Sequence, residues 1–408
     1  MEKKKSIAII GTAGVPAKYG GFETLAHNLV NELNDEFDIH VYASKKIYPA
    51  NERPKFWNKA RVHYFGLSAN GVSSIPYDFI TMLHACRYAD TLIVLGVSGG
   101  VFIPLIKLIS RCKVIVNIDG LEWRRDKWAK PIKWFLKVSE RLAVRFSDAD
   151  ITDNLSIKRY TSIKYKTVSH MIAYGADHAQ PEKISGEMVN KYPFLDSDYA
   201  FKVARIEPEN NLEMIVKAFS KMPRKTLVVV GNWNSSEFGT QLREAYKAYD
   251  NLHLLDPIYD QEELNVLRSN CKLYVHGHSA GGTNPSLVEA MILQLPILSF
   301  DVSFNRATTH NQALFFKNYL GLIDLVQSTN DDTLLQVAQK MKAIALQNYT
   351  WKQVANRYRG LVLGFDYNYK KSKFKRKSAK VPYSKMLKTG HAHLQNVQLN
   401  FDELKDIK

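Results

Sequence analysis

The stretch at residues 273–293 contains, in order, a short apolar run, a glycine-bearing loop and a second apolar run of helical length. The first run is β-prone, and the second has the composition of a buried helix. Gly281 and Gly282 allow positive φ and close backbone approach, and Pro285 suits a first helical turn. This order predicts a strand, a loop and a helix whose exposed N–H groups can bind a phosphate or sugar hydroxyls.

Two interpretations of this stretch stay open. Glu289, one turn inside the expected helix, can accept hydrogen bonds from two vicinal hydroxyls, which a ligand site would use. The alternative is an ordinary turn between a strand and a helix that Ser286 caps. Other parts of the chain must decide between them.

Length and composition set limits on the fold. A chain of 408 residues favours two domains, and 45% hydrophobic with 24% charged residues indicates a globular protein with a full core. The three cysteines lack metal-ligand spacing and leave one unpaired, which favours a reducing compartment. The charged residues 1–5 lead straight into a strand, and the longest apolar runs are interrupted, so we expect a cytoplasmic protein without a membrane span.

The net charge of +16 is unevenly distributed along the chain. Basic residues are in excess in residues 1–180 and 365–408, whereas residues 181–364 are balanced. This asymmetry predicts an acidic partner, either anionic lipid or nucleic acid, unless the charge serves solubility alone.

The first strand and helix are separated by a long loop. Residues 6–10 (SIAII) are typical of a buried strand, and residues 23–33 have helical apolar spacing. A dinucleotide fingerprint would need G-x-G-x-x-G directly at the turn between them, and this is absent. We instead expect the pair Gly20 and Gly21, just before the helix, to close over a ligand from one side.

Strand and helix patterns then alternate to the end of the chain. Strands are expected at residues 39–43, 62–65, 91–95, 114–118, 149–152, 199–204, 226–230 and 253–255, and helices at 77–88, 131–146, 212–219 and 262–267. This alternation predicts an α/β fold of two Rossmann-like domains facing across a cleft. The expected divisions are an N-terminal domain 1–176, a linker 177–198, a C-terminal domain 199–345, a closing helix 346–364 and a basic tail 365–408.

Acidic residues follow the strand expected at residues 114–118. Asp119 and Glu122 fall beyond its carboxyl end, where open α/β sheets bind ligands. The alternative for Asp119 is a turn or cap residue.

A segment at residues 123–146 combines tryptophans with recurring basic residues. Its helical part has an apolar stripe on one side and a basic row on another, which predicts contact with anionic lipid headgroups. A solvated basic helix is the alternative, and nucleic acid ranks third because no binding motif accompanies the segment. The predicted membrane-surface residues are Trp123, Arg125, Lys127, Trp128, Lys130, Lys133, Trp134, Lys137 and Arg141.

Four long motifs carry a resemblance to a known family. They are GTAGVPAKYGGFET (residues 11–24), NIDGLEWRRDKW (117–128), RIEPENN (205–211) and HSAGGTNPSLVEAM (278–291). In order and spacing they resemble the retaining glycosyltransferases of family four, which have the GT-B architecture. More narrowly, they resemble the bacterial rhamnosyltransferases that build polysaccharide repeat units. The resemblance spans about residues 6–360.

The resemblance implies that the second domain binds a nucleotide sugar, dTDP-β-L-rhamnose, without a metal or other cofactor. Arg205 and helix N-termini would neutralise the diphosphate, and Glu289 would hold a ribose or deoxyribose hydroxyl. The implied donor-binding residues are Gly20, Gly21, Arg205, Glu207, Asn211, Gly231, Gly282, Thr283, Asn284, Pro285, Ser286, Leu287 and Glu289.

The acceptor side is implied to lie in the first domain. Asp119, with Glu122 and Arg124, would face the acceptor hydroxyl, and Asp119 would orient or deprotonate it. The acceptor would be a lipid-diphosphate-linked sugar, and the product a β-L-rhamnoside. The implied location is the inner face of the cell membrane, where the basic tail is either a tether or disordered.

The sequence departs from the wider family at two places. The family's lysine before the asparagine of RIEPENN falls at Asn210, and the first glutamate of its Glu-seven-Glu pattern falls at Gly281. A transferase that uses UDP-glucose or UDP-GlcNAc is therefore an alternative. A GT-B nucleotide-sugar epimerase or binding protein without transfer activity is another.

Overall fold

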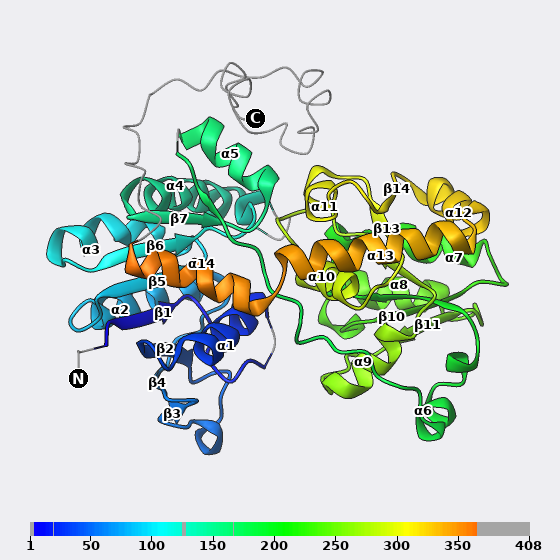
Figure 1. Cartoon of the computed structure of the whole chain (residues 1–408), viewed down its shortest axis with the longest axis horizontal. Helices are drawn as coiled ribbons and strands as arrows, with labels where there is room; N and C mark the ends of the chain where they lie inside the picture. Colours follow the sequence, from blue (N-terminus) through cyan, green and yellow to red (C-terminus); the bar gives the residue numbers. More distant parts are fainter. Residues whose placement is uncertain (1–3, 19, 125–127, 166, 365–408) are drawn as a thin grey trace. The chain divides into compact units, whose positions relative to one another are not determined.

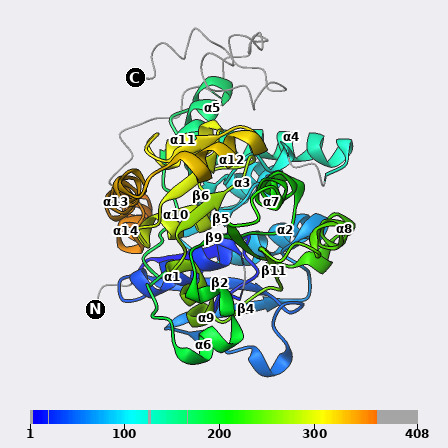
Figure 2. The same cartoon turned by 90° about the vertical axis from the view of Figure 1, so that its right-hand side faces the viewer.

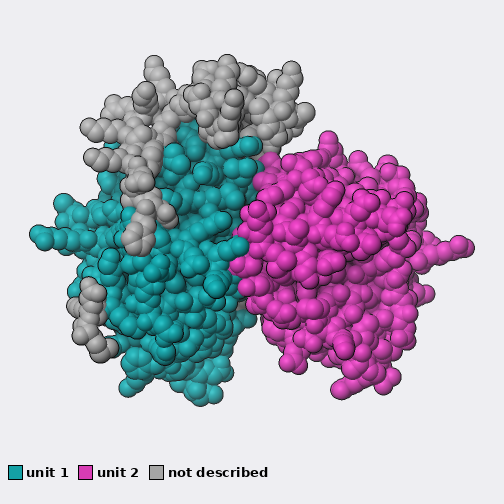
Figure 3. Space-filling view, in the orientation of Figure 1, with its two compact units in different colours: residues 1–174, 351–408 teal, residues 175–350 magenta. Residues whose placement is uncertain are grey.

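The chain forms two compact units, Met1–Tyr174 with Trp351–Lys408 and Gly175–Thr350 (Figure 3). The computed structural model describes residues 4–18, 20–124, 128–165 and 167–364 (Figure 1). Each unit contains its own mainly parallel sheet, so the predicted α/β fold with two domains is confirmed. The basic tail, residues 365–408, lies outside the described residues.

The sheet of the first unit has eight strands in the order β3-β4-β2-β1-β5-β6-β7-β8. Their bounds are β1 Ser6–Ile10, β2 Asp38–Ser44, β3 Phe56–Trp57, β4 Ala60–Phe65, β5 Thr91–Leu95, β6 Lys113–Asn117, β7 Ala149–Thr152 and β8 His170–Met171. Neighbouring strands pair in parallel, except β3 and β4. Strands β1, β5 and β7 have the predicted bounds. In β1 and β5 a mainly apolar run marks a parallel strand that is buried on both faces.

Helices cover both faces of the first sheet. They are α1 Gly21–Leu33, α2 Ser74–Ala85, α3 Ile103–Ile109, α4 Lys130–Phe146, α5 Leu155–Tyr165 and α14 Trp351–Leu363, with short 3-10 turns η1 Ala50–Glu52, η2 Gly71–Ser73, η3 Gly100–Phe102 and η4 Glu122–Arg124. Leu29 and Val30 of α1 share one core with Val354 and Tyr358 of α14. Helix α14, at the end of the described residues, thus packs against α1 (Figure 1).

The sheet of the second unit is entirely parallel, in the order β11-β10-β9-β12-β13-β14. Its strands are β9 Tyr199–Val203, β10 Thr226–Val230, β11 Leu252–Leu255, β12 Leu273–His276, β13 Ile297–Phe300 and β14 Leu314–Phe316. Its helices are α6 Gly186–Lys191, α7 Leu212–Ser220, α8 Glu237–Tyr246, α9 Gln261–Ser269, α10 Pro285–Ile292, α11 Ser303–Thr308, α12 Tyr319–Ser328 and α13 Asp331–Asn348, with η5 Pro193–Asp196, η6 Pro208–Asn210 and η7 Trp233–Ser235.

The helices of the second unit form two groups. Helices α7 and α12 pack against each other and share one core with α8 and one face of the sheet (Figure 2). Helix α10 packs against α13. Residues 177–198, expected to be a linker, contain α6 and η5 and belong to the second unit.

Strand order reverses once in the middle of each sheet. The reversal lies between β1 and β5 in the first sheet and between β9 and β12 in the second. Loops that follow strands on either side of such a reversal diverge and leave room for a ligand. In the first unit these are the β1 loop (residues 11–20) and the β5 loop (residues 96–99). In the second unit they are the β9 loop (residues 204–211) and the β12 loop (residues 277–284).

Some features are absent from the part of the chain that the structure describes. No helix there combines the length and the apolar character needed to cross a membrane. No three His, Cys, Asp or Glu side chains in those residues come together as metal ligands. The three cysteines are all free thiols.

Three histidines gather on the face of the first sheet opposite α1. The Nδ1 atom of His40 lies 2.9 Å from Nε2 of His63, and the Tyr42 hydroxyl lies 2.6 Å from Nδ1 of His84. Burial lowers the pKa of His63 to about 4 and also lowers the pKa of His40 and His84. The folded protein therefore favours the neutral imidazoles.

We expect acidification to destabilise the first unit through these histidines. Because their pKa is lower in the folded state, the unfolded state binds protons more readily, and stability is lost as pH falls from 6.5 towards about 4. Half-buried His63 should account for about 1–2 kcal/mol of this loss. Chemical denaturation at several pH values should show a weaker pH dependence for His63→Gln than for the wild type. The exposed-site control His310→Asn should match the wild type, and a common slope in all three proteins would contradict the assignment.

Candidate active site

The β12 loop carries the chain from a strand directly into a helix. Strand β12 ends at His276, and α10 begins with Pro285 at its first turn, as predicted. Gly281 has a φ of 112°, a conformation that favours glycine. Asn284 caps the helix, since its side chain accepts hydrogen bonds from the N–H and the hydroxyl of Ser286 at 3.0 and 2.8 Å. The alternative in which Ser286 is the cap is wrong, because proline at the first helical position places the cap one residue earlier.

Side chains join the β9 loop to the β12 loop. The amide of Asn211 donates to the carbonyl oxygen of Gly277 at 2.7 Å. The side-chain oxygen of Asn210 lies 3.0 Å from Nδ1 of His278. Asn211 has a left-handed backbone with a φ of 50°, which asparagine tolerates better than most residues. The loops on both sides of the strand-order reversal are therefore held together.

Arg205 is the exposed cation of the β9 loop. Its side chain is 46% exposed, and its Nε atom lies 3.8 Å from the carboxylate of Glu207. Asn210, where the resembled family has a lysine, is buried, and its amide donates to the carbonyl oxygen of Arg205 at 2.8 Å. Asn210 thus shapes the loop, whereas Arg205 supplies its positive charge.

Glu289 lies in α10 with its carboxylate held from two sides. One oxygen contacts the guanidinium of Arg268, a buried residue of α9, and the other lies 3.1 Å from Nε2 of His178. Burial opposes the charge, but Arg268 and His178 outweigh it and lower the pKa of Glu289 to about 2. Glu289 is therefore an ionised acceptor for hydroxyl groups at neutral pH. No local sequence pattern pointed to Arg268 or His178, because both lie far from Glu289 along the chain.

Three predicted donor-binding residues have structural roles. The side chain of Leu287 is fully buried and its N–H donates to the carbonyl oxygen of Asn284 at 3.0 Å, which contradicts a donor contact. Gly231 follows β10 where an added Cβ would lie 2.5 Å from a carbonyl oxygen, so close packing requires glycine. Thr283 is buried, and its hydroxyl lies 3.3 Å from the hydroxyl of Thr308. Gly282, the residue before it, is half-buried.

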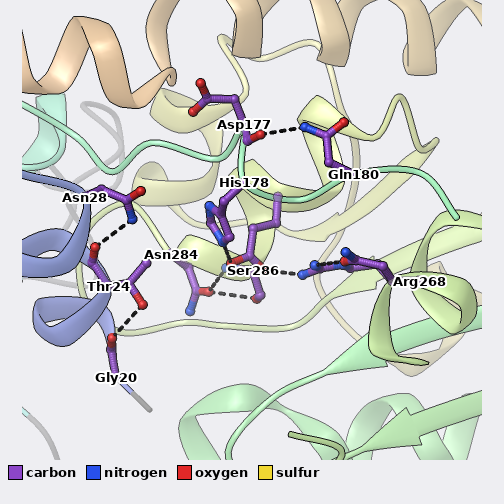
Figure 4. Close-up of polar contacts among 11 residues, drawn as sticks. Gly20, Thr24, Asn28, Asp177, His178, Gln180, Arg268, Asn284 and Ser286 are labelled. Atoms are coloured by element: carbon purple, nitrogen blue, oxygen red, sulfur yellow. Dashed lines mark hydrogen bonds and ion pairs between the residues drawn. The ribbon is translucent and has the colours of Figure 1, made fainter. Parts of the chain in front are cut away.

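A buried glutamate braces the β1 loop. The carboxylate of Glu23 accepts hydrogen bonds from the N–H of Ala13 at 2.6 Å and the hydroxyl of Thr12 at 3.2 Å. Burial raises the pKa of Glu23, and these hydrogen bonds oppose the rise. Gly20 caps α1 with a φ of 131°, and its carbonyl oxygen accepts from the Thr24 hydroxyl at 3.0 Å (Figure 4). Glu23 is not among the predicted site residues, because it lies beside the apolar stripe of the expected helix and no motif marks it as polar support.

Asp119 follows β6 in a left-handed backbone conformation. Its φ is 57°, a conformation that aspartate, like asparagine, tolerates better than most residues. Its N–H donates to the Asn117 side-chain oxygen at 3.0 Å, and the Tyr174 hydroxyl donates to its carboxylate at 3.2 Å. These two hydrogen bonds hold Asp119 beyond the carboxyl end of β6, where open α/β sheets bind ligands.

The tryptophans near Asp119 differ in role. Trp123 is buried, and its indole N–H donates to the buried carboxylate of Glu140 at 3.0 Å. Trp123 is therefore a core residue, which contradicts its predicted contact with a membrane. Trp128 is half-buried, and its indole N–H donates to the Glu122 carboxylate at 2.9 Å. Glu122 thus has a hydrogen-bond partner only a few residues away in the chain. Arg124, the last residue of η4, is half-buried.

Five of the predicted membrane-surface residues belong to α4. Trp134 is 68% exposed, and Lys130 and Arg141 are exposed as well. Lys133 and Lys137 are half-buried, and Nζ of Lys137 lies 4.3 Å from the ring of buried Trp123. Arg125 and Lys127 lie outside the described residues.

Most of the second unit matches a known protein family. Residues 187–328 match the family described as glycosyl transferases group 1. Residues 4–177 match a domain of unknown function, DUF1972. The second unit therefore contains a glycosyl transferases group 1 domain, which includes both the β9 loop and the β12 loop.

Solved structures with the same architecture cover most of the chain. Sucrose-phosphate synthase from Thermosynechococcus elongatus has a TM-score of 0.74 at 15% identity, over 89% of this chain and 99% of that one. HepE from Anabaena, in complex with UDP and glucose, has a TM-score of 0.67 at 13% identity, over 88% of this chain and 100% of that one. These likenesses confirm the GT-B fold.

A curated relative matches a shorter part of the chain. Glycosyltransferase 1 domain-containing protein 1 from Xenopus tropicalis is 22% identical over 160 residues, which cover 38% of this chain and 46% of that protein. The chain thus spans about half the length of the curated relative that it matches.

The two glycines at the start of α1, the cap Gly20 and the first helical residue Gly21, should respond differently to alanine. At Gly20 an added Cβ would lie 1.9 Å from the Glu23 carboxylate in a conformation that favours glycine, whereas at Gly21 it would make ordinary contact with Tyr174 at 3.6 Å. We expect Gly20→Ala to lower the free energy of unfolding by about 1–3 kcal/mol and Gly21→Ala to change it by less than about 0.5 kcal/mol. Urea denaturation of both variants measures this, and equal effects would refute the bracing role of Glu23.

Proposed function

We propose that this chain, whose second unit contains a glycosyl transferases group 1 domain, is a retaining glycosyltransferase. It moves L-rhamnose from dTDP-β-L-rhamnose to a lipid-diphosphate-linked sugar in bacterial cell-surface polysaccharide synthesis. The observation that carries this proposal is the joined pair of β9 and β12 loops at the strand-order reversal of the second sheet. A nucleotide-sugar donor is supported by HepE, a structural neighbour in complex with UDP and glucose.

The donor-side chemistry requires positive charge and hydroxyl acceptors. Breaking the bond between sugar and diphosphate leaves negative charge on the diphosphate, which cations and backbone N–H groups stabilise. Exposed Arg205 supplies this charge, and it carries more of it because Asn210 replaces a lysine. Ionised Glu289 accepts a hydrogen bond from the ribose or deoxyribose.

The loop geometry supports a deoxy sugar as the transferred group. The resembled family places a glutamate that holds sugar hydroxyls at the position of Gly281. Here the φ of 112° disfavours any side chain, so a glutamate at this position would strain the loop. A site without that carboxylate suits a sugar with fewer hydroxyls to hold, such as 6-deoxy rhamnose.

Asp119 is the acceptor-side residue of the proposal. It orients or deprotonates the attacking hydroxyl, with Glu122 and Arg124 nearby in the chain. Its left-handed backbone and the hydrogen bond from Tyr174 keep the carboxylate in a defined position, as such a role requires.

Transfer can be measured with a panel of donors. Purified protein is incubated with dTDP-rhamnose, UDP-glucose or UDP-GlcNAc and a lipid-diphosphate-linked GlcNAc or glucose, and nucleotide release and product mass are followed. We expect a deoxyhexose increment with dTDP-rhamnose alone. Asp119→Asn and Glu289→Ala should each reduce the rate by about 100-fold or more, since each removes a group that contacts a substrate. Asp332→Asn, at an exposed position of α13, serves as the control.

Other outcomes distinguish the alternatives. A hexose or N-acetylhexosamine increment would replace the proposed donor with UDP-glucose or UDP-GlcNAc. Conversion of free nucleotide sugar without an acceptor and without nucleotide release would establish an epimerase. Donor binding with neither reaction would indicate a binding protein.

The acceptor lipid places the proposed reaction at the cytoplasmic face of the cell membrane, where α3 and α4 offer a docking surface. The two helices pack together. Helix α4 contributes exposed Lys130, Arg141 and Trp134, and α3 contributes Leu108 and Ile109, which are 82% and 54% exposed. Basic side chains attract anionic headgroups while apolar ones enter the interface, so this surface suits anionic lipid better than nucleic acid.

Vesicle flotation tests this surface. We expect binding to vesicles that contain anionic phospholipid, weaker binding at high salt, and little binding to purely zwitterionic vesicles. The double variant Leu108→Ser, Trp134→Ser should bind about 10-fold less, because it removes apolar area from the interface. Val72→Ser changes an exposed valine on η2, away from α3 and α4 in sequence, and should leave binding intact. Equal binding by both variants would exclude this docking surface.

A further inference from the structure

The segment that leads from the first unit into the second carries hydrogen bonds to both carboxylates of the proposed mechanism. The Tyr174 hydroxyl donates to Oδ1 of Asp119 at 3.2 Å. Four residues further on, Nε2 of His178 lies 3.1 Å from Oε1 of Glu289. Tyr174 and Asp119 belong to the first unit, and His178 and Glu289 to the second, so each contact lies within one unit.

Tyr174 is built to remain a hydrogen-bond donor. Its side chain is buried, and burial, followed by the charge of Asp119, raises the pKa of its hydroxyl well above the ordinary value. The hydroxyl therefore keeps its proton at neutral pH. The Asp119 backbone is held separately by Asn117, whose amide in turn donates to the hydroxyl of Tyr358 in α14 at 3.0 Å. The bond from Tyr174 thus fixes the carboxylate of a residue whose backbone is already fixed.

His178 completes a two-sided grip on Glu289. On one side Arg268 is 1% exposed, and its second nitrogen donates to the side-chain oxygen of Asn265 at 2.7 Å, which immobilises the guanidinium. On the other side the His178 side chain is 29% exposed. Because Glu289 is ionised, His178 must carry its proton on Nε2 to make this contact. Of the two residues that contact Glu289, His178 is therefore the more accessible to solvent.

The backbone between Tyr174 and His178 is itself tied down. Ala176 is buried, and its N–H donates to the carbonyl oxygen of Tyr349 at 2.8 Å. The Tyr349 hydroxyl donates to the carbonyl oxygen of Thr308 at 2.8 Å. Residue 349 lies just before the chain returns to the first unit, so both passages between the units are hydrogen-bonded together. These hydrogen bonds link the two ends of the segment through one continuous network, and a contiguous network of this kind is a physical route for coupling.

We infer that residues 174–178 are a positioning element for both carboxylates, in which Tyr174 orients Asp119 and His178 orients Glu289. The inference rests on the proposed function. A hydroxyl group of the nucleotide-sugar donor that binds Glu289 shares the carboxylate oxygen that His178 contacts. The side chain of His178 then shifts, and the shift reaches Tyr174 through the backbone at Ala176. Donor binding is thereby coupled to the orientation of Asp119, although neither positioning residue contacts a reacting atom.

The test uses single and double variants of the full chain. Tyr174→Phe removes only a hydroxyl, His178→Ala removes the contact to Glu289, and His178→Gln retains an amide donor. Gln180→Ala is the matched control, because Gln180 is exposed in the same segment and its side chain donates to the carbonyl oxygen of Asp177. Calorimetry with dTDP and UDP measures nucleotide binding, steady-state transfer gives kcat and donor KM, and thermal unfolding monitors the fold.

The expected results separate positioning from a general effect on stability. His178→Ala should raise donor KM about 5- to 10-fold, and His178→Gln should recover most of this loss. Tyr174→Phe should lower kcat about 5- to 10-fold with donor KM unchanged. Because one element serves both carboxylates, the double variant Tyr174→Phe, His178→Ala should lose less in kcat/KM than the product of the single losses.

Two results would contradict the inference. Multiplicative losses in the double variant would show independent contacts and overturn the coupling, and variants that match Gln180→Ala would overturn the positioning roles. In both cases the wild type still transfers sugar, so only this inference fails. A wild type that binds neither dTDP nor UDP overturns the proposed function and this inference together.

Discussion

In a parallel sheet every strand runs in the same direction, so the loops that follow the strands gather at one edge. Apart from β3, both sheets of this protein obey that constraint. Reversal of strand order between β1 and β5, and between β9 and β12, then separates neighbouring loops in the middle of each edge. Asp119 follows β6, Arg205 follows β9 and the β12 loop follows β12, so each lies at the edge where the strands of its own sheet end.

Buried carboxylates hold these loops in shape. Glu23 braces the β1 loop, Glu289 joins α10 to α9 and to the chain ahead of β9, and Glu140 joins α4 to buried Trp123. Removal of a charge from water costs several kcal/mol, and each of these groups offsets that cost with several donors. Since the donors come from different segments, each carboxylate fixes the relative position of the segments around it. The protein therefore combines rigid supports with a few exposed groups, such as Arg205, that remain available to a ligand.

Glycine illustrates how one residue type serves different purposes here. Gly20 and Gly281 have positive φ, and Gly231 allows a close backbone approach. Gly21 has neither constraint, since an added Cβ would make only ordinary contacts. The sequence places all four in or beside loops that are expected to bind a ligand. Only the backbone angle and the neighbouring atoms show whether a position requires glycine. In the proposed function Gly281 matters most, because its positive φ disfavours the glutamate that the resembled family has at this position.

The sequence by itself determined the alternation of strands and helices, the glycine loops and the polar residues that follow strands. Strands β1, β5, β7 and β10 were predictable to the residue, and in β1, β5 and β10 the mainly apolar run that marks them is a local property. Strands β8, β13 and β14 were missed, because runs of two to four residues are too short to show a strand pattern. Tertiary structure alone decided that Trp123 is buried and that α14 joins the first unit. It also decided that Arg268 and His178 hold Glu289, because the partners of a buried charge come from distant segments and leave no periodic signal along the chain.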